Sequence, residues 1–382
     1  MAGSSITSSL GDAVIDMDIG GDLFLLVGSE LGGSEHCLFR VCSSTLRRSS
    51  LVWKKMLFGS WAEEKPAEGQ WTVSLPDDRS TALRIILGII HGRFEYLPTE
   101  LPLAQLDELI ILVDKYDLTR VIGPWANTWM TRVQHSVEYT ALAHVTRTHV
   151  AWELGNEDWF ATEARNAVFQ TSAKKDGQLV YHHDATSFPL ANREHFGPPN
   201  LIGKITALWS HYYRLHGAPY IVLTSSLEVI TQSRLALIQE ILDSFHKQIS
   251  LRTGDSFACD SGCGQVASKK NKSLKSYESN QLHAKKECDI FILGGIYRGM
   301  LGLFGGSLPK NASDISESAT QLLGVIANLF QQVDCFKDHD SCLPASQFTK
   351  FELDARTDQR WKNLLKSSHK ESMATRRKAL GL

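Results

Sequence analysis

Three short segments of the chain carry the periodicity of β-strands. Residues 22–28 are a compact apolar run bounded by glycine, and residues 37–42 alternate apolar and polar positions after a turn-rich connection. Residues 70–76 alternate again, and Pro76 ends that run. We therefore predict a hairpin that is followed, at a distance, by a third strand.

Helical spacing replaces this alternation between the second and third strands. Apolar residues recur every three to five positions across 43–61, which predicts two short helices, with Ser49 or Ser50 placed to cap the second. After the third strand, the apolar residues between 83 and 90 cover more than one face of a predicted helix. That helix must therefore be packed on most of its sides.

The two ends of this packed helix also carry local signals. Asp77, Asp78 and Ser80 offer side-chain oxygens to the unpaired amide groups of a helix start. Gly92 allows the helix to stop, because glycine tolerates the left-handed conformation that follows many helices. We expect the helix to begin next to the acidic pair and to end at this glycine.

Two more helices complete an amino-terminal unit. Residues 101–118 have one apolar stripe and a polar opposite face, and residues 121–133 are expected to carry Pro124 in the first helical turn. Together, residues 20–134 are predicted to form an α+β unit in which helices cover a small sheet. Residues 1–19 are expected to be a flexible lead-in.

The remainder of the chain is predicted to be mainly α-helical. Residues 135–170 form a helical extension, and residues 171–200 lose periodicity and are expected to be a linker or long loop. Residues 201–382 return to helical spacing, apart from the charged, serine-rich segment 264–281, which is expected to be mobile. The glycine-rich stretch 290–306 lacks dinucleotide-binding spacing, so we assign its glycines to helix–helix packing.

Composition narrows the class of protein. The 382 residues include 40 basic and 42 acidic side chains, so a net charge of −2 creates no global field for nucleic acid or an anionic membrane. No apolar run reaches the length of a spanning helix, and the amino terminus lacks a secretory signal. Seven cysteines, spread thinly, indicate reduced thiols, and we expect a cytoplasmic and/or nuclear protein.

Six segments follow one another in order within residues 20–134, namely DLFLLVG, FRVCSSTL, SLVWKKMLF, VSLPDD, ILGIIHGRFEYLP and LDELIILVDKYDLTRVIGPWANTW. In order and spacing they resemble the BTB/POZ domains, in particular the branch found in filamentous fungi. The remaining chain resembles, more loosely, the long helical region attached to those fungal proteins. The resemblance implies a BTB/POZ fold, a small mixed sheet capped by helices, followed by a mainly α-helical carboxy-terminal region.

The resemblance also implies a function, which is protein–protein interaction without catalysis. Such domains self-associate or act as adaptors between a cullin-type ubiquitin-ligase scaffold and a substrate, so we expect protein partners, a homodimer or a scaffold complex. One departure concerns the charged dimer pocket of many animal members, where a His-Lys pair follows the hairpin. Cys42 and Ser43 stand at those positions here, so corepressor-type dimer chemistry is not carried over.

Two groups of residues are predicted to meet partners. The loop between the packed helix and the next one contains Phe94, Glu95, Tyr96 and Leu97. These residues would face a partner, because aromatic side chains dominate interface energies, unless they fold into the core. The predicted self-association residues, with the core as the equal alternative, are Leu46, Leu51, Val52 and Met56.

Cysteine and histidine clusters leave a structural zinc ion open. The residues that could supply a tetrahedral shell are Cys259, Cys263, Cys288, Cys335, His339 and Cys342. Cys259 and Cys263 lie far along the chain from Cys335, His339 and Cys342, so the alternative is free thiols in loops that flank helices. A complete shell of this kind would stabilise the fold and leave no open position for catalysis.

No recognisable catalytic motif is present, so we do not expect an enzyme or a bound cofactor apart from that zinc ion. The chain has no nucleophile elbow, no phosphate loop and no His-Glu-x-x-His sequence. The alternative function is a nuclear regulatory protein that uses its basic carboxy-terminal tail, with Arg376, Arg377 and Lys378. We do not expect nucleic-acid binding, because such runs are usually solvated and no aromatic residues alternate with the charges.

Overall fold

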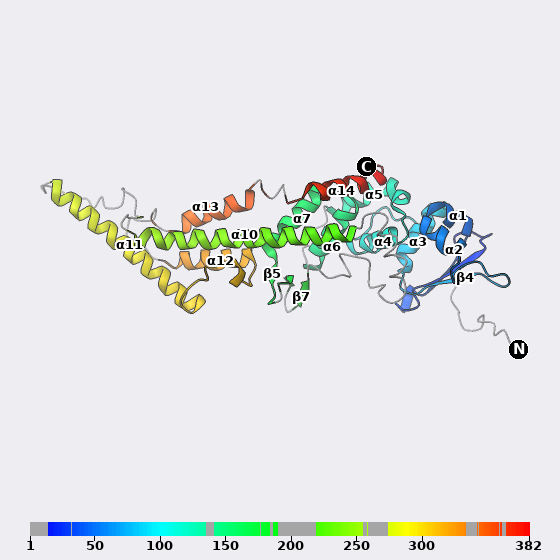
Figure 1. The fold of residues 1–382 in the computed structure, drawn as a ribbon, viewed down its shortest axis with the longest axis horizontal. Coiled ribbons are helices and arrows are strands. Elements are labelled where there is room, and N and C mark those ends of the chain that lie inside the picture. Colours follow the sequence, from blue (N-terminus) through cyan, green and yellow to red (C-terminus); the bar gives the residue numbers. More distant parts are fainter. Residues whose placement is uncertain are drawn as a thin grey trace. The chain divides into compact units, whose positions relative to one another are not determined.

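The structure is a computed structural model that folds into two compact units of mixed α and β structure, mostly helical (Figure 1). It describes residues 14–31, 33–134, 141–175, 177–183, 186–189, 219–254, 258, 274–333, 342, 344–358, 360 and 364–382. The first unit contains the described residues up to Phe160, together with Pro219, Tyr220 and Ser367–Leu382. The second contains those of Ala161–Asn192 and Ile221–Lys366.

A small mixed sheet lies in the first unit, with the strand order β1-β3-β2-β4. Strands β2 (Leu23–Val27) and β3 (Cys37–Val41) pair antiparallel, as the predicted hairpin requires, and β4 (Thr72–Leu75) pairs parallel with β2. Alternate residues of β2 and β4 are buried, which matches the alternating sequence of β4, whereas β2 is apolar throughout. The sheet therefore presents one apolar face to the core.

A fourth strand lies within the predicted flexible lead-in. Strand β1 (Ile15–Asp16) pairs parallel with β3, and Asp16 forms an ion pair of 2.6 Å with Arg40. Met17 is fully buried beside it. The expectation for residues 1–19 is therefore wrong for residues 14–19, and the rest of that segment lies outside the described residues.

Two short helices follow the hairpin as predicted, α1 (Ser43–Ser49) and α2 (Leu51–Phe58). Ser50 caps α2, because its hydroxyl accepts a hydrogen bond from the Trp53 amide at 3.0 Å. The same hydroxyl donates to the Tyr116 carbonyl. Trp53 is fully buried and stacks on the ring of Tyr116 with 4.3 Å between centroids, so this cap also holds α2 to a later helix.

Helix α3 (Ser80–His91) is packed on most sides, as its sequence predicts. Its start differs from the prediction, because Glu35 and not the acidic pair accepts hydrogen bonds from the Ser80 amide and hydroxyl, at 2.8 and 3.0 Å. Gly92 ends the helix with φ +69°, a value that glycine adopts without strain.

His91, at the end of α3, connects this helix to the hairpin. Its Nδ1 donates to the Leu87 carbonyl at 3.0 Å, and its Nε2 accepts from the Cys42 amide at 3.1 Å. This pair of contacts requires the neutral ring. Burial lowers the pKa of His91 and outweighs the Leu87 carbonyl and Asp18, which raise it, so the neutral form is favoured.

The predicted helices α4 (Leu103–Lys115), α5 (Thr119–Gln134) and α6 (Ala141–Glu153) follow, and α4 packs between α3 and α6. Helix α5 begins earlier than predicted, so Pro124 lies inside it and not in its first turn. Proline in a helix interior removes one backbone hydrogen bond. The predicted position of Pro124 was therefore wrong.

The last helix of the chain, α14 (Ser367–Ala379), belongs to this first unit and packs on α5 and α6. Two glycines allow the close approach. A Cβ atom on Gly123 would lie 2.4 Å from the Leu380 carbonyl oxygen, and one on Gly155 would lie 2.4 Å from that of Met373. His369 and Met373 are fully buried there, and Arg376 forms an ion pair with Glu153.

A second, three-stranded sheet lies where we predicted a linker or long loop over residues 171–200. Its strands are β5 (Ser172–Ala173), β6 (Leu179–His183) and β7 (Thr186–Pro189), all antiparallel in the order β5-β6-β7. Leu179, Val180 and Tyr181 are buried. Strand β5 has only two residues, and the glycine, proline and polar residues around β6 and β7 favoured a loop in the sequence.

The helices of the second unit are α10 (Pro219–Thr253), α11 (Leu274–Phe304), α12 (Ala319–Gln331) and α13 (Pro344–Thr357); α7 (Glu157–Gln170) leads from the first unit's residues into it. Helix α11 begins inside the predicted mobile segment 264–281, so its residues from Leu274 onward are helical; the earlier ones lie outside the described residues. The prediction that the glycines of 290–306 serve helix–helix packing holds for Gly295 and Gly299, whereas Gly294 and Gly302 have no atom within 4 Å of an added Cβ. A Cβ atom would lie 3.1 Å from Val333 at Gly295 and 2.8 Å from Leu329 at Gly299.

Candidate protein-interaction surface

The loop after α3 is held rigidly by contacts on its inner side. The Arg93 amide donates to the Gly88 carbonyl at 2.7 Å, and the chain then forms the 3-10 turn η3 (Phe94–Tyr96). Leu97 packs close to Gly88, where a Cβ atom would lie 3.6 Å from its side chain. The indole of Trp129 donates to the Pro98 carbonyl at 3.0 Å. These contacts fix the direction in which the turn presents its outer side chains.

Phe94 is the outermost residue of this turn. Its side chain is 59% exposed, and its ring lies 6.1 Å from that of Trp125 on α5. Trp125 in turn stacks on Trp129 with 6.5 Å between centroids. Three aromatic rings therefore form a continuous row from the core to the surface, and Phe94 is at its exposed end.

The four predicted partner-facing residues divide into two pairs. Phe94 and Glu95 are exposed, whereas Tyr96 and Leu97 are half-buried and serve as anchors of the turn. The carboxylate of Glu95 accepts from the Arg93 guanidinium at 2.5 Å. Its own backbone amide and Arg93 lower the pKa of Glu95, so the residue adds a fixed negative charge beside the exposed ring.

A second exposed apolar surface lies on α2, where we predicted self-association. Leu51 is 58% exposed, whereas Val52 and Met56 are half-buried. Leu46 is fully buried, so its assignment to this surface was wrong and the core alternative holds. Two further residues, Phe58 and Trp61, are also exposed, at 38% and 45%, and were not predicted.

Asp78, the second residue of the acidic pair before α3, meets Lys115 and Tyr116 at the end of α4 inside the first unit. Asp78 is fully buried and accepts from the Lys115 ammonium and the Tyr116 hydroxyl. Burial, together with the nearby charge of Asp78, raises the pKa of Tyr116 well above its usual value, so the phenol stays protonated as a donor. This buried cluster is fully used in holding α3, α4 and α2 together.

The predicted zinc ligands lie mostly outside the described residues, namely Cys259, Cys263, Cys335 and His339. Cys288 on α11 and Cys342 are described, and both are buried. Among the residues that the structure describes, no group of three His, Cys, Asp or Glu side chains is placed to hold a metal ion. The zinc hypothesis therefore stays a prediction.

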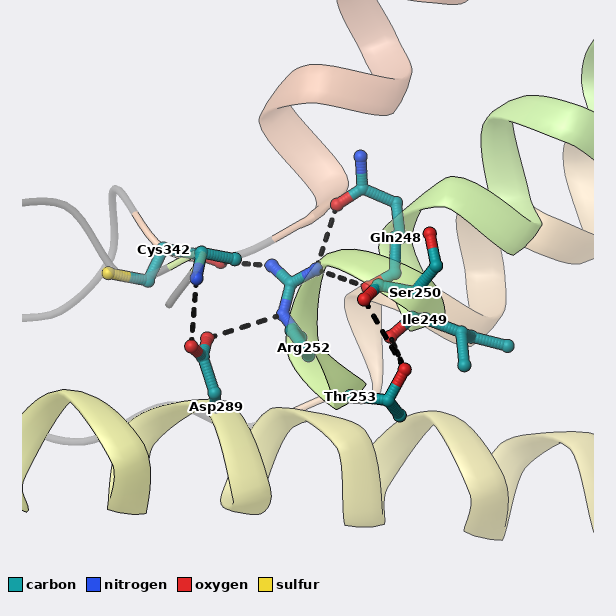
Figure 2. Close-up of polar contacts among 8 residues, drawn as sticks. Gln248, Ile249, Ser250, Arg252, Thr253, Asp289 and Cys342 are labelled. Carbon is teal, nitrogen blue, oxygen red and sulfur yellow. Dashed lines mark hydrogen bonds and ion pairs between the residues drawn. The ribbon is translucent and has the colours of Figure 1, made fainter. Parts of the chain in front are cut away.

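A buried ion pair occupies the neighbourhood of Cys342 (Figure 2). Arg252, at the end of α10, donates to the Cys342 carbonyl at 2.9 Å and to the Gln248 carbonyl and side chain at 2.8 and 2.9 Å. Its Nε lies 3.8 Å from an oxygen of Asp289 on α11, and the other oxygen of Asp289 accepts from the Ala258 amide at 2.9 Å. The pair fixes the end of α10 to the inner side of α11.

The basic tail of the alternative function is part of α14. Arg376 is held by Glu153, and the side chains of the pair are only 17% and 9% exposed. Arg377 and Lys378 are exposed. Two of the three cations of the tail are therefore available to solvent, and the third stabilises the first unit.

No family model, no curated protein and no solved structure matches this chain. Within its described ranges, none of the helices combines the length and the apolar character that crossing a membrane requires.

Proposed function

We propose that this chain is a non-enzymatic protein–protein interaction module, with a BTB/POZ-type domain in its first unit that docks on a protein scaffold, of which a cullin-type ubiquitin-ligase subunit is the leading candidate. The order of the elements supports the proposal: a hairpin, two short helices, a parallel strand, and then a set of packed helices. The same order underlies the resemblance in sequence. The cytoplasmic and/or nuclear location expected from the thiols is compatible with such a scaffold.

The observation that carries the proposal is the exposed aromatic ring of Phe94 on a rigid turn. A large apolar side chain that is 59% exposed and backed by Trp125 resembles the anchors that dominate binding energy at protein interfaces. Because the turn is already fixed by its inner contacts, binding would order few additional groups. Glu95 and Arg93 would form part of the polar rim around the anchor.

The test is the affinity of the purified full chain for the amino-terminal region of a cullin, measured by calorimetry. Replacing Phe94→Ala is expected to weaken binding by about thirtyfold or more, the loss typical of a central aromatic anchor. The matched control is Phe58→Ala, which removes an exposed phenylalanine from the α2 surface and should leave this affinity unchanged. Equal affinities for the wild-type chain and Phe94→Ala would contradict the proposal.

Self-association through α2 is the companion proposal, supported by the exposure of Leu51, Phe58 and Trp61. Scattered exposed apolar residues are common, but Leu51 and Phe58 lie two turns apart on α2 and Trp61 follows three residues later, so together they indicate a contact surface. Leu51→Asp is expected to weaken self-association through this surface, so light scattering should give a lower average mass than for the wild-type chain. Its exposure means that the folded state should tolerate the change.

A further inference from the structure

Helix α11 has two faces of different character. Its inner face buries Cys288, Ile292, Ile296 and Met300. Asp289 further fixes that face to α10 through Arg252 (Figure 2). The outer face is also apolar, but it is exposed to solvent. Contiguous exposed apolar residues of this kind mark a surface that another molecule covers.

The outer face carries a stripe that is the same when read in either direction. Ile290, Tyr297 and Leu301 are 57%, 46% and 64% exposed, and Gly294 lies between the first two. The positions 290, 294, 297 and 301 are separated by four, three and four residues. This is the spacing of the contact positions of a coiled coil, and its two halves mirror each other.

Gly294 is a notch in this stripe. A Cβ atom at Gly294 would meet nothing within 4 Å, whereas the inner glycines 295 and 299 are closely packed against Val333 and Leu329. Glycine weakens a helix interior, so a glycine there usually serves close packing. Gly294 has no such packing contact within the described chain. A notch of this kind can receive a large side chain from a facing helix.

We propose that the outer face of α11 pairs antiparallel with the same face of a second copy of this chain about a two-fold axis. In that arrangement, Ile290 meets Leu301 of the second copy, and Tyr297 enters the notch at Gly294 of the second copy. Both contacts occur twice because the interface is symmetric. The antiparallel direction sets the large side chain of Tyr297 opposite the open position at Gly294, whereas a symmetric parallel pair would set Gly294 opposite itself and leave the notch unfilled.

The flanks of the stripe complement each other in the same register. Phe291 is 46% exposed at one edge, and Arg298, two turns further along, is exposed on the same edge. An antiparallel pair brings Phe291 next to Arg298 of the second copy, and the reverse contact follows by symmetry. A guanidinium over an aromatic face is an attractive pair, so chemistry as well as shape favours a second copy as the occupant.

The test is sedimentation equilibrium of the full chain, with Leu51→Asp in every variant to silence the α2 surface. We expect a dimer of twice the 42.5 kDa chain mass. Ile290→Glu and Leu301→Lys should each weaken dimerisation by about a hundredfold or more, because each places charges in the apolar contact. The double variant Ile290→Glu/Leu301→Lys should restore the dimer, because antiparallel pairing sets the introduced carboxylate of each copy opposite the introduced ammonium of the other.

Gly294→Glu with the control Gly302→Glu provides a second, independent comparison. Both glycines are exposed on α11 with open space around an added Cβ atom, but only Gly294 lies in the stripe. We expect the first variant to be monomeric and the second to remain dimeric, with equal helicity by circular dichroism. A monomeric parent chain, single variants that remain dimeric, or a double variant that is not restored would each overturn the inference. None of these results would bear on the docking of Phe94.

Discussion

At the scale of single residues, Asp78 shows how a buried carboxylate stabilises the first unit. It lies at the start of α3 and is matched by two donors of α4, so a charge that would be costly alone is paired and hydrogen-bonded. We predict that Asp78→Ala lowers the free energy of unfolding by about 3–5 kcal/mol, because it leaves the Lys115 ammonium without its partner. Chemical denaturation followed by tryptophan fluorescence measures the change, since Trp53 stacks on Tyr116.

The neighbouring residue supplies the control for Asp78. Asp77 has the same charge and lies one position earlier, but it is exposed. Asp77→Ala is therefore expected to change the free energy of unfolding by no more than about 0.5 kcal/mol. Similar losses for both variants would mean that local charge before α3, and not the buried cluster, determines the stability.

At the scale of elements, Arg234 of α10 joins three segments of the second unit. Its guanidinium donates to the carbonyl of Thr171 at 2.9 Å, next to β5, and to the carbonyls of Ile315, Ser316 and Glu317 at 3.3, 3.2 and 2.7 Å, just before α12. We predict that Arg234→Met lowers the free energy of unfolding of this unit by about 3 kcal/mol or more, because buried carbonyls lose their donors.

Amide hydrogen exchange at residues 312–318 measures this loss of stability locally, and the exchange rate there should rise in Arg234→Met. Arg234→Lys should rescue little, because an ammonium cannot reproduce the planar fork that reaches several carbonyls. Lys247→Ala, an exposed change on the same helix, should leave the exchange rates unaltered. If residues 312–318 of Arg234→Lys were as protected from hydrogen exchange as in the wild-type chain, a positive charge alone would be sufficient to stabilise this segment.

The elements that could be predicted are those whose pattern is local. The hairpin, β4, the packed helix α3 and its end at Gly92 follow from periodicity and one glycine. The start of α3 could not be predicted, because Glu35 lies 45 residues earlier in the chain and reaches Ser80 only through the fold. Strands β1 and β5 have two residues each, too few for any period to be read.

The candidate surfaces were predicted less completely than the elements. Phe94 was predicted correctly to be exposed, because the helices on either side of its loop already supply enough apolar surface to the core. Leu46 and Leu51 have the same side chain and were assigned to the same surface, but the first is fully buried and the second is exposed. Their difference depends on where α1 packs against α3, which is a tertiary contact that spacing alone does not reveal.

At the scale of the whole molecule, the first unit is built from both ends of the described chain. Residues of α14 are separated from α5 and α6 by more than 200 positions, yet they bury His369, Met373 and Leu380 against that unit. Contacts of such long range must form late or slowly, because closing a long loop costs entropy. Helix α14 therefore completes the first unit, whose other described residues come mainly from the amino-terminal part of the chain.

This arrangement predicts different effects for two adjacent arginines of α14. Arg376→Ala leaves the Glu153 carboxylate nearly buried without its cation and should lower the free energy of unfolding of the first unit by about 2–4 kcal/mol. Arg377→Ala removes an exposed charge of the same kind and should change it by no more than about 0.5 kcal/mol. Calorimetry of the full chain, with hydrogen exchange at 141–155, measures both variants. If both variants changed the free energy of unfolding only slightly and both lost salt-dependent binding to duplex DNA equally, the tail would be a solvated basic segment and not a packed helix. Salt dependence identifies such binding, because phosphate contacts weaken steeply as salt rises.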